Sequence, residues 1–194
     1  MKKIALLLFV FFSQLNFAQT ESAKIQTDFE SIIDFTRKNQ INKVIDMTYP
    51  RFVKVFGNEG LTGLATGMLT GMGIKTIYEE NPINLKISKI SKLKDGFICM
   101  GEYDNSMILE FKDEKMTDFF AMGNSKEQKI EKINSKKVRM KGKAYLLAIN
   151  DSYTNKTWKY LNYTSELANS PQASQIVSKE IVLESEKLKE SIGK

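Results

Sequence analysis

The chain of 194 residues contains no histidine and a single cysteine, Cys99. Histidine is the commonest general base near neutral pH and the commonest metal ligand in proteins. Its absence excludes a histidine-dependent catalytic triad, a zinc site that contains histidine and a histidine-metal oxygenase. One cysteine cannot form an intramolecular disulfide, so we expect a fold held by its hydrophobic core, with no metal and no other cofactor.

Long apolar runs are also missing. The stretch Ile4–Phe12 is unbroken but has only nine residues, whereas a helix that spans a bilayer takes about 20. Lys2 and Lys3 precede this run, and a more polar stretch ending in the small residue Ala18 follows it. This order is typical of a secretory signal peptide cleaved before Gln19. We therefore predict that residues 1–18 form a leader, that the protein is exported, and that no stable membrane span remains.

Positive charge is concentrated between Lys126 and Lys143, where eight basic residues accompany two acidic ones. A basic patch can meet an anionic membrane surface, a polysaccharide or nucleic acid. This segment has no aromatic residue to stack on bases, which argues against a nucleic-acid partner. A solvated strand face that resists aggregation is the better interpretation.

Apolar residues recur at three- and four-residue spacing in the first third of the chain. This period predicts helices over residues 22–39, 41–48 and 58–73, with Pro50 ending the second. In the third helix, Gly63, Gly67 and Gly71 form a second stripe. The stripe fits either a membrane-inserting segment or a buried helix that a neighbour approaches closely, and the short length favours burial.

After Pro82 the apolar period changes from 3.6 to 2, which predicts strands. We expect a strand from Ile83 to Ile87, a hairpin turn at Asp95–Gly96 and one long bent strand over 97–111, with a second turn at Asp104–Asn105 as the alternative. Further along we expect a helical excursion at 114–128 and strands at 137–149 and 158–163. A C-terminal helix should begin at Ser170–Pro171.

These elements predict an α+β fold, in which N-terminal helices pack on a curved antiparallel sheet of four to six strands and a C-terminal helix follows. The break Thr48–Tyr49–Pro50, the strand Met107–Asp113 and the segments Ala148–Asp151 and Lys156–Tyr163 resemble the nuclear transport factor 2-like superfamily, in the version exported by Bacteroidetes-type bacteria. The resemblance implies a cone-like sheet around an apolar pocket, a single domain over 19–165, a helical tail over 166–194 and a bacterial periplasmic or secreted protein.

The predicted pocket combines that resemblance with the apolar face of the long strand. We expect a volume of a few hundred cubic ångströms, mostly apolar walls and Tyr103 as the main polar group. The predicted lining residues are Phe29, Ile33, Met68, Phe97, Tyr103, Met107, Leu109 and Phe111.

Carboxylates are the remaining candidates for acid–base chemistry. Enzymes of the superfamily place a carboxylate or an Asp–His pair in the pocket, but this chain has no histidine to match, so the resemblance assigns no catalytic residue. Glu102, Asp104 and Glu110 lie in the long strand with the opposite parity to its apolar face. Cys99 lies among apolar neighbours, where a thiol is inert packing.

Two functions follow from these observations. The first is an exported non-catalytic module that binds a small apolar ligand or a partner protein, including a second copy of itself. The alternative is a small-molecule isomerase, dehydratase or hydrolase that uses a lone carboxylate and Tyr103. A carboxylate directed into the pocket would favour the enzyme.

Overall fold

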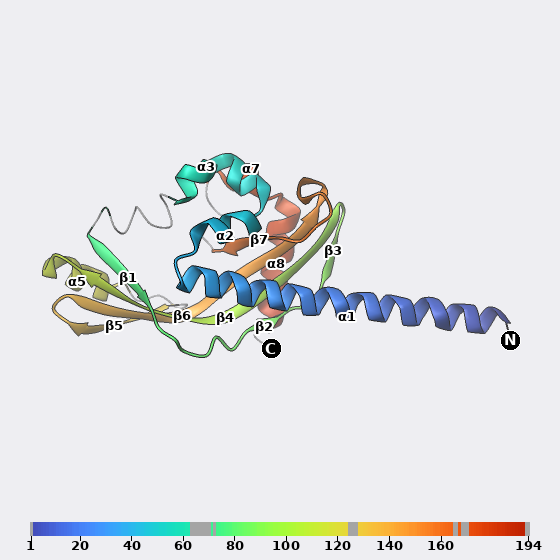
Figure 1. Cartoon of the computed structure of the whole chain (residues 1–194), viewed down its shortest axis with the longest axis horizontal. Helices are drawn as coiled ribbons and strands as arrows, with labels where there is room; N and C mark the ends of the chain where they lie inside the picture. The colour runs from blue at the N-terminus through green and yellow to red at the C-terminus, as the bar shows by residue number, and fades with distance from the viewer. Residues whose placement is uncertain are drawn as a thin grey trace.

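Two long antiparallel strands, β4 (Gly96–Phe111) and β6 (Lys137–Asp151), run through the centre of the fold (Figure 1). The structure is a computed structural model that describes residues 2–62, 71, 73–123, 128–164, 167 and 171–192, and only the backbone of residues 2–18 and 62. The two strands pair without a register shift from Gly96–Asp151 to Glu110–Lys137. The prediction of one long strand is confirmed, and the alternative turn at Asp104–Asn105 is wrong.

Shorter strands flank this pair and complete a seven-stranded antiparallel sheet. At one end the order is β1-β4-β6-β5, and at the other end β2 and β3 pair with β4 while β7 pairs with β6. These strands are β1 (Ile74–Tyr78), β2 (Lys86–Ile87), β3 (Ser91–Leu93), β5 (Gln128–Asn134) and β7 (Lys159–Tyr163). The sheet therefore has more strands than the four to six expected, because β1 and β5 lack a clear period-two signal of their own.

The predicted strand over residues 83–87 is shorter than its sequence pattern suggests. Only Lys86 and Ile87 pair with β4, because Asn84 has a positive φ of 44° and interrupts the extended backbone. The hairpin turn at Asp95–Gly96 is present. Gly96 has a φ of 141°, and a Cβ there would lie 1.9 Å from the carbonyl oxygen of Asn150, so only glycine fits this position.

In the described residues the α-helices are α1 (Lys2–Arg37), α2 (Ile41–Met47), α3 (Pro50–Thr62), α5 (Glu114–Ala121), α7 (Ala173–Ile176) and α8 (Lys179–Ile192). Asn39, with a φ of 55°, separates α1 from α2 as predicted. Pro50 begins α3, which is kinked at Gly57. The predicted helix at 58–73 is thus the end of α3 up to residue 62, and Gly63, Gly67 and Met68 lie outside the described residues.

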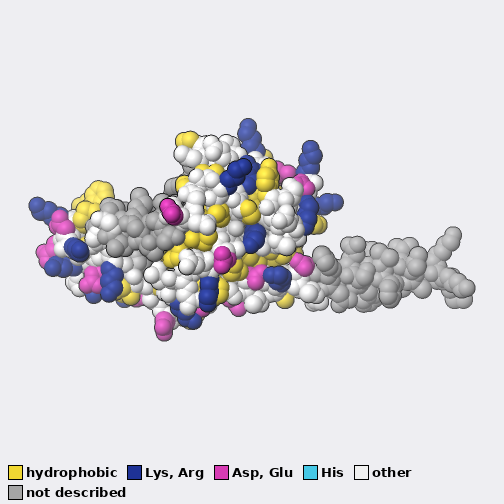
Figure 2. All heavy atoms as spheres, turned by 45° about the horizontal axis from the view of Figure 1, so that its top comes forward, with side chains coloured by type: hydrophobic (Ala, Val, Ile, Leu, Met, Phe, Trp, Pro, Cys, Tyr) yellow, Lys and Arg dark blue, Asp and Glu magenta, His cyan; other side chains and the backbone are white. Residues whose placement is uncertain are grey.

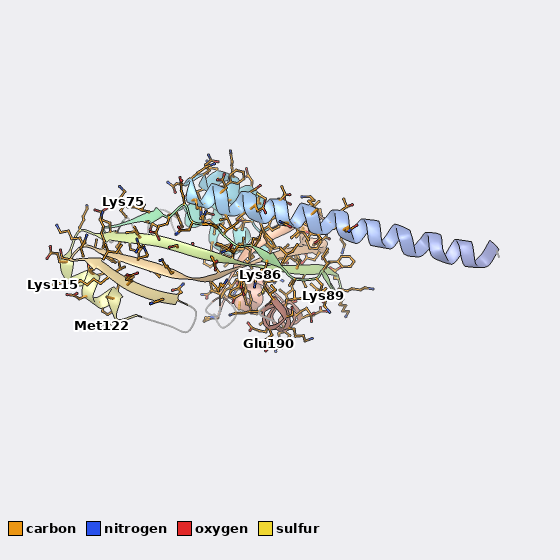
Figure 3. All side chains as sticks on the ribbon, turned by 90° about the horizontal axis from the view of Figure 1, so that it is seen from below. Lys75, Lys86, Lys89, Lys115, Met122 and Glu190 are labelled. Carbon is orange, nitrogen blue, oxygen red and sulfur yellow. The ribbon has the colours of Figure 1, made fainter. Side chains whose placement is uncertain are left out.

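The two faces of the sheet carry different helices, and Figure 3 shows α1 and α8 on opposite sides of it. Cys99, on the odd-numbered face of β4, packs in a core with Ile25 and Phe29 of α1. Ile98 and Met100, on the even-numbered face, pack with residues of α8. A third core, under α5, lies at the far end of the sheet and includes Leu109 and Phe111.

Helix α1 lies very close to the sheet at Gly101. A Cβ at this position would be 2.8 Å from the ring of Phe29, whose edge contacts Tyr160 with ring centroids 5.6 Å apart. Two carboxylates add hydrogen bonds: Glu21 accepts from the indole N–H of Trp158, and Asp28 accepts from the hydroxyl of Tyr160. The N-terminal half of the helix extends beyond the sheet (Figure 1).

The C-terminal helix is present and begins later than the sequence predicts. Pro171 lies in a turn, and α8 starts at Lys179. The hydroxyl of Ser178 accepts a hydrogen bond from the backbone N–H of Ile181 at 3.2 Å, which caps the first turn. Val177, Ile181 and Leu188 are buried against the sheet, so the tail forms part of the main core.

Candidate functional site

A cavity of about 330 Å³ lies between helices α1, α2 and α3 and the β6–β7 side of the sheet. Most of its lining is aliphatic or aromatic, including Ile33, Val44, Ile45, Phe52, Leu146 and Leu161. Figure 2 shows the face of the molecule that carries these helices, where apolar side chains lie among scattered charged ones. The size and the apolar walls are typical of a small-molecule site.

Helix periodicity explains why the lining residues of each helix lie on one face of that helix. The lining residues Ile41, Val44 and Ile45 of α2, together with Thr48 just after its end, follow the i, i+3, i+4, i+7 spacing and so share one face. In α1, Ile32 and Ile33 precede Thr36 by four and three residues, so these side chains also share one face.

The polar groups of the lining differ in whether they already have partners. The hydroxyls of Thr36 and Thr48 donate to backbone carbonyls of their own helices, each at 2.8 Å, and the hydroxyl of Tyr160 donates to Asp28. The hydroxyl of Tyr103 has no hydrogen-bond partner among the residues that the structure describes. The Tyr103 hydroxyl is therefore free to bind a ligand.

Tyr103 is a neutral hydrogen-bond donor at physiological pH. Burial raises the pKa of its hydroxyl to about 12, the neighbouring Tyr78 adds to this effect, and the charge of Arg37 opposes it. A phenol with such a pKa stays protonated, so it can donate to an acceptor and cannot serve as a base.

The structure divides the predicted pocket residues among several places. Ile33 and Tyr103 line the cavity. Phe29 is fully buried beside it, between Gly101 and Tyr160, and Met68 lies outside the described residues.

The remaining predicted residues lie at the two ends of β4. Phe97 is 42% exposed, near the hairpin end, and Met107, Leu109 and Phe111 pack in the core under α5. The strand has 16 residues and extends beyond the helices that cover its middle, so its apolar face contributes to more than one core.

The residues of α2 that line the cavity were not predicted as pocket residues, although the helical period of residues 41–48 was visible in the sequence.

The acidic residues of β4 lie away from the cavity. Lys143 binds Glu102 at 3.2 Å and Asp104 at 2.7 Å. The hydrogen bonds that Lys143 and Asn84 donate to Asp104 lower the pKa of the Asp104 carboxyl. Glu110 is 3.5 Å from Lys137. Carboxylates held by lysine in this way are poor candidates for general bases.

Cys99 is part of the core beneath α1. Burial raises the pKa of its thiol, and its Sγ lies 3.4 Å from the backbone carbonyl oxygen of Ser88. A buried thiol with a raised pKa is a weak nucleophile, which agrees with the packing role expected from the sequence.

The basic segment forms much of the β5–β6 hairpin, where several of its charges are paired. The ion pairs are Lys132–Asp118, Lys137–Glu110, Arg139–Glu79 and Lys143–Asp104. The pairing with acids from other elements reduces the positive potential that the sequence alone suggests.

Among the residues that the structure describes, no group of three or more cysteine, aspartate or glutamate side chains could hold a metal ion. None of the helices in this part of the chain combines the length and the apolar character that crossing a membrane requires.

Comparison with known proteins gives no match to a family model, to a curated protein or to a solved structure. The function is therefore inferred from the cavity and the groups around it.

Proposed function

We propose that this protein is an exported, non-catalytic module that binds a small apolar ligand in the cavity between α1–α3 and the β6–β7 side of the sheet. The observation that carries the proposal is a space of about 330 Å³ with mainly apolar walls and the hydroxyl of Tyr103, which has no partner in the described part of the chain. Transfer of an apolar molecule from water into this space is favourable, and each buried methylene group would contribute about 0.8 kcal/mol to the free energy of binding.

The proposal includes a nuclear transport factor 2-like fold with a cone-like sheet. Helices that cover one face of an antiparallel sheet and two long central strands support this part. The break at Tyr49–Pro50 also lies beside β7, because the backbone N–H of Tyr49 donates to the carbonyl oxygen of Tyr160 at 2.8 Å.

Export from a bacterial cell is the third part of the proposal, with residues 1–18 removed as a leader. The contacts of α1 with the sheet described above come from Glu21, Ile25, Asp28 and Phe29. All of these residues follow Ala18, so cleavage before Gln19 would keep them.

The alternative of a small isomerase, dehydratase or hydrolase has weaker support. Its carboxylate would have to reach the cavity, whereas Glu102 and Asp104 bind Lys143 and do not line it. Tyr103 by itself supplies a hydrogen-bond donor and no base.

Binding of 1-decanol, a neutral ten-carbon probe, tests the ligand site. We expect saturable binding by calorimetry and a melting temperature that rises with probe concentration, because the probe binds only the folded state. Val44→Trp places a large ring in the cavity and should abolish both effects.

Leu183→Trp is the matched control, since Leu183 lies on α8 and is 65% exposed. This variant should bind decanol like the unchanged protein. Absence of saturable binding, or equal binding by the Val44→Trp variant, would refute the proposed site.

A further inference from the structure

The cationic end of helix α1 lies next to the cavity. Ile33 and Thr36 line the cavity, and Arg37 is the last residue of the helix. Arg37 follows Ile33 by four residues, so the two side chains lie on the same side of α1. The helix ends over the middle of the sheet, where Figure 1 shows it meeting α2.

The guanidinium group of Arg37 is only partly satisfied. Its Nη1 donates to the backbone carbonyl oxygen of Asn81 at 3.2 Å. Its Nη2 is buried and has no hydrogen-bond partner among the described residues, and none of the ion pairs found in this part of the chain includes Arg37. A buried donor on a charged group costs free energy until an acceptor reaches it.

Tyr103 supplies a second donor. It lines the cavity, and the charge of Arg37 acts on its hydroxyl. The cavity thus has aliphatic walls and a neutral donor, and a cation follows directly after the lining residue Thr36 on α1. The acceptor that both groups lack would be supplied by an anion.

From this arrangement we infer that the ligand is an aliphatic carboxylate of medium length, and this inference rests on the proposed function. The carboxylate accepts hydrogen bonds from Nη2 of Arg37 and from the hydroxyl of Tyr103, and the hydrocarbon chain fills the apolar space. A cavity of about 330 Å³ holds a chain of about ten carbons, because a methylene group takes up a volume similar to the ~30 Å³ of a water molecule in the liquid.

Calorimetric titration with decanoate and with 1-decanol separates the head group from the chain. We expect the unchanged protein to bind decanoate about ten-fold more tightly than decanol, because a charge-assisted hydrogen bond replaces a neutral one. Arg37→Gln should remove this preference and keep the affinity for decanol, and Arg37→Lys should restore part of it. Tyr103→Phe should weaken decanoate binding several-fold.

Arg51→Gln is the matched control. Arg51 lies over the ring of Tyr153 and donates to the carbonyl oxygen of Ser174, outside the cavity lining. It should leave both affinities unchanged.

The outcomes distinguish the two proposals. Equal affinity for decanol and decanoate, or a decanoate preference that survives Arg37→Gln, would overturn the carboxylate inference while leaving the apolar site in place. Failure of both probes to bind would remove the proposed function and the inference with it.

Discussion

Tyr49 shows how a single side chain connects distant parts of this chain. Its hydroxyl donates to the Asp151 carboxylate at 2.7 Å inside the core. The other oxygen of Asp151 accepts from the backbone N–H groups of Tyr153 and Thr154, at 2.9 and 3.1 Å, and caps the short 3₁₀ helix η2 (Ser152–Thr154). In the sequence, Tyr49 and Asp151 belong to separate motifs, and folding brings them into one network.

Tyr49→Phe should lower the free energy of unfolding by about 1–3 kcal/mol, because a buried carboxylate oxygen loses its donor. Tyr153→Phe is the control: Tyr153 is 57% exposed, and removal of its hydroxyl should change stability by less than about 0.5 kcal/mol. Urea unfolding of both variants measures the difference. Equal effects would show that the Tyr49–Asp151 hydrogen bond adds nothing to stability.

At the scale of elements, the close approach of α1 to the sheet depends on Gly101. The glycine stripe at residues 63–71 predicts a close approach of a neighbouring element, but in the described residues the close approach occurs within β4, beneath Phe29. Gly71 has open space around its Cβ position, whereas Gly63 and Gly67 lie outside the described residues, so the role of the rest of the stripe stays a prediction.

Gly101→Ala should destabilise the protein by about 1–3 kcal/mol, because the new methyl group would force Phe29 and the helix away from the sheet. Gly60→Ala in α3 is the matched control. A Cβ there lies 3.8 Å from that of Phe56, an ordinary contact, so this change should be neutral or stabilise by up to about 1 kcal/mol. Thermal and urea unfolding compare the two, and a neutral Gly101→Ala would mean that α1 can shift without cost.

At the scale of the whole molecule, buried tyrosines determine the response to alkaline pH. Burial is the main cause of a raised pKa in Tyr49, Tyr78, Tyr103, Tyr160 and Tyr163. The unfolded state ionises these groups near pH 10, while the folded state holds them neutral to higher pH. Their contribution is fully present below about pH 10 and is lost as the pH rises toward the folded values, such as about 12 for Tyr103.

We therefore expect the free energy of unfolding to decrease above pH 10, with a slope of up to about 1.4 kcal/mol per pH unit for each tyrosine involved. Urea unfolding between pH 8 and 11.5 measures this slope. Tyr103→Phe should reduce it by the share of one tyrosine, which separates this effect from lysine titration at the surface. A constant free energy across the range would contradict the prediction.

The local sequence pattern by itself predicts the helices over residues 22–37 and 41–47, the turn at Asp95–Gly96 and the strands β4, β6 and β7. In each of these segments the apolar period or the turn residues agree with the final environment, so local preference and burial favour the same conformation. The absence of histidine and the opposite parity of Glu102 and Tyr103 were equally visible in the sequence.

Only the tertiary structure decided the strands β1 and β5, the start of α8 and the composition of the cavity. β5 contains mostly charged and polar residues and is extended because β6 offers it backbone partners. The apolar face of β4 is divided between two cores because the strand continues past the end of α1 (Figure 1). Arg37 and Tyr103 are far apart in the chain, and the effect of the Arg37 charge on the Tyr103 hydroxyl depends on the packing of a helix end against a strand, which no local period encodes.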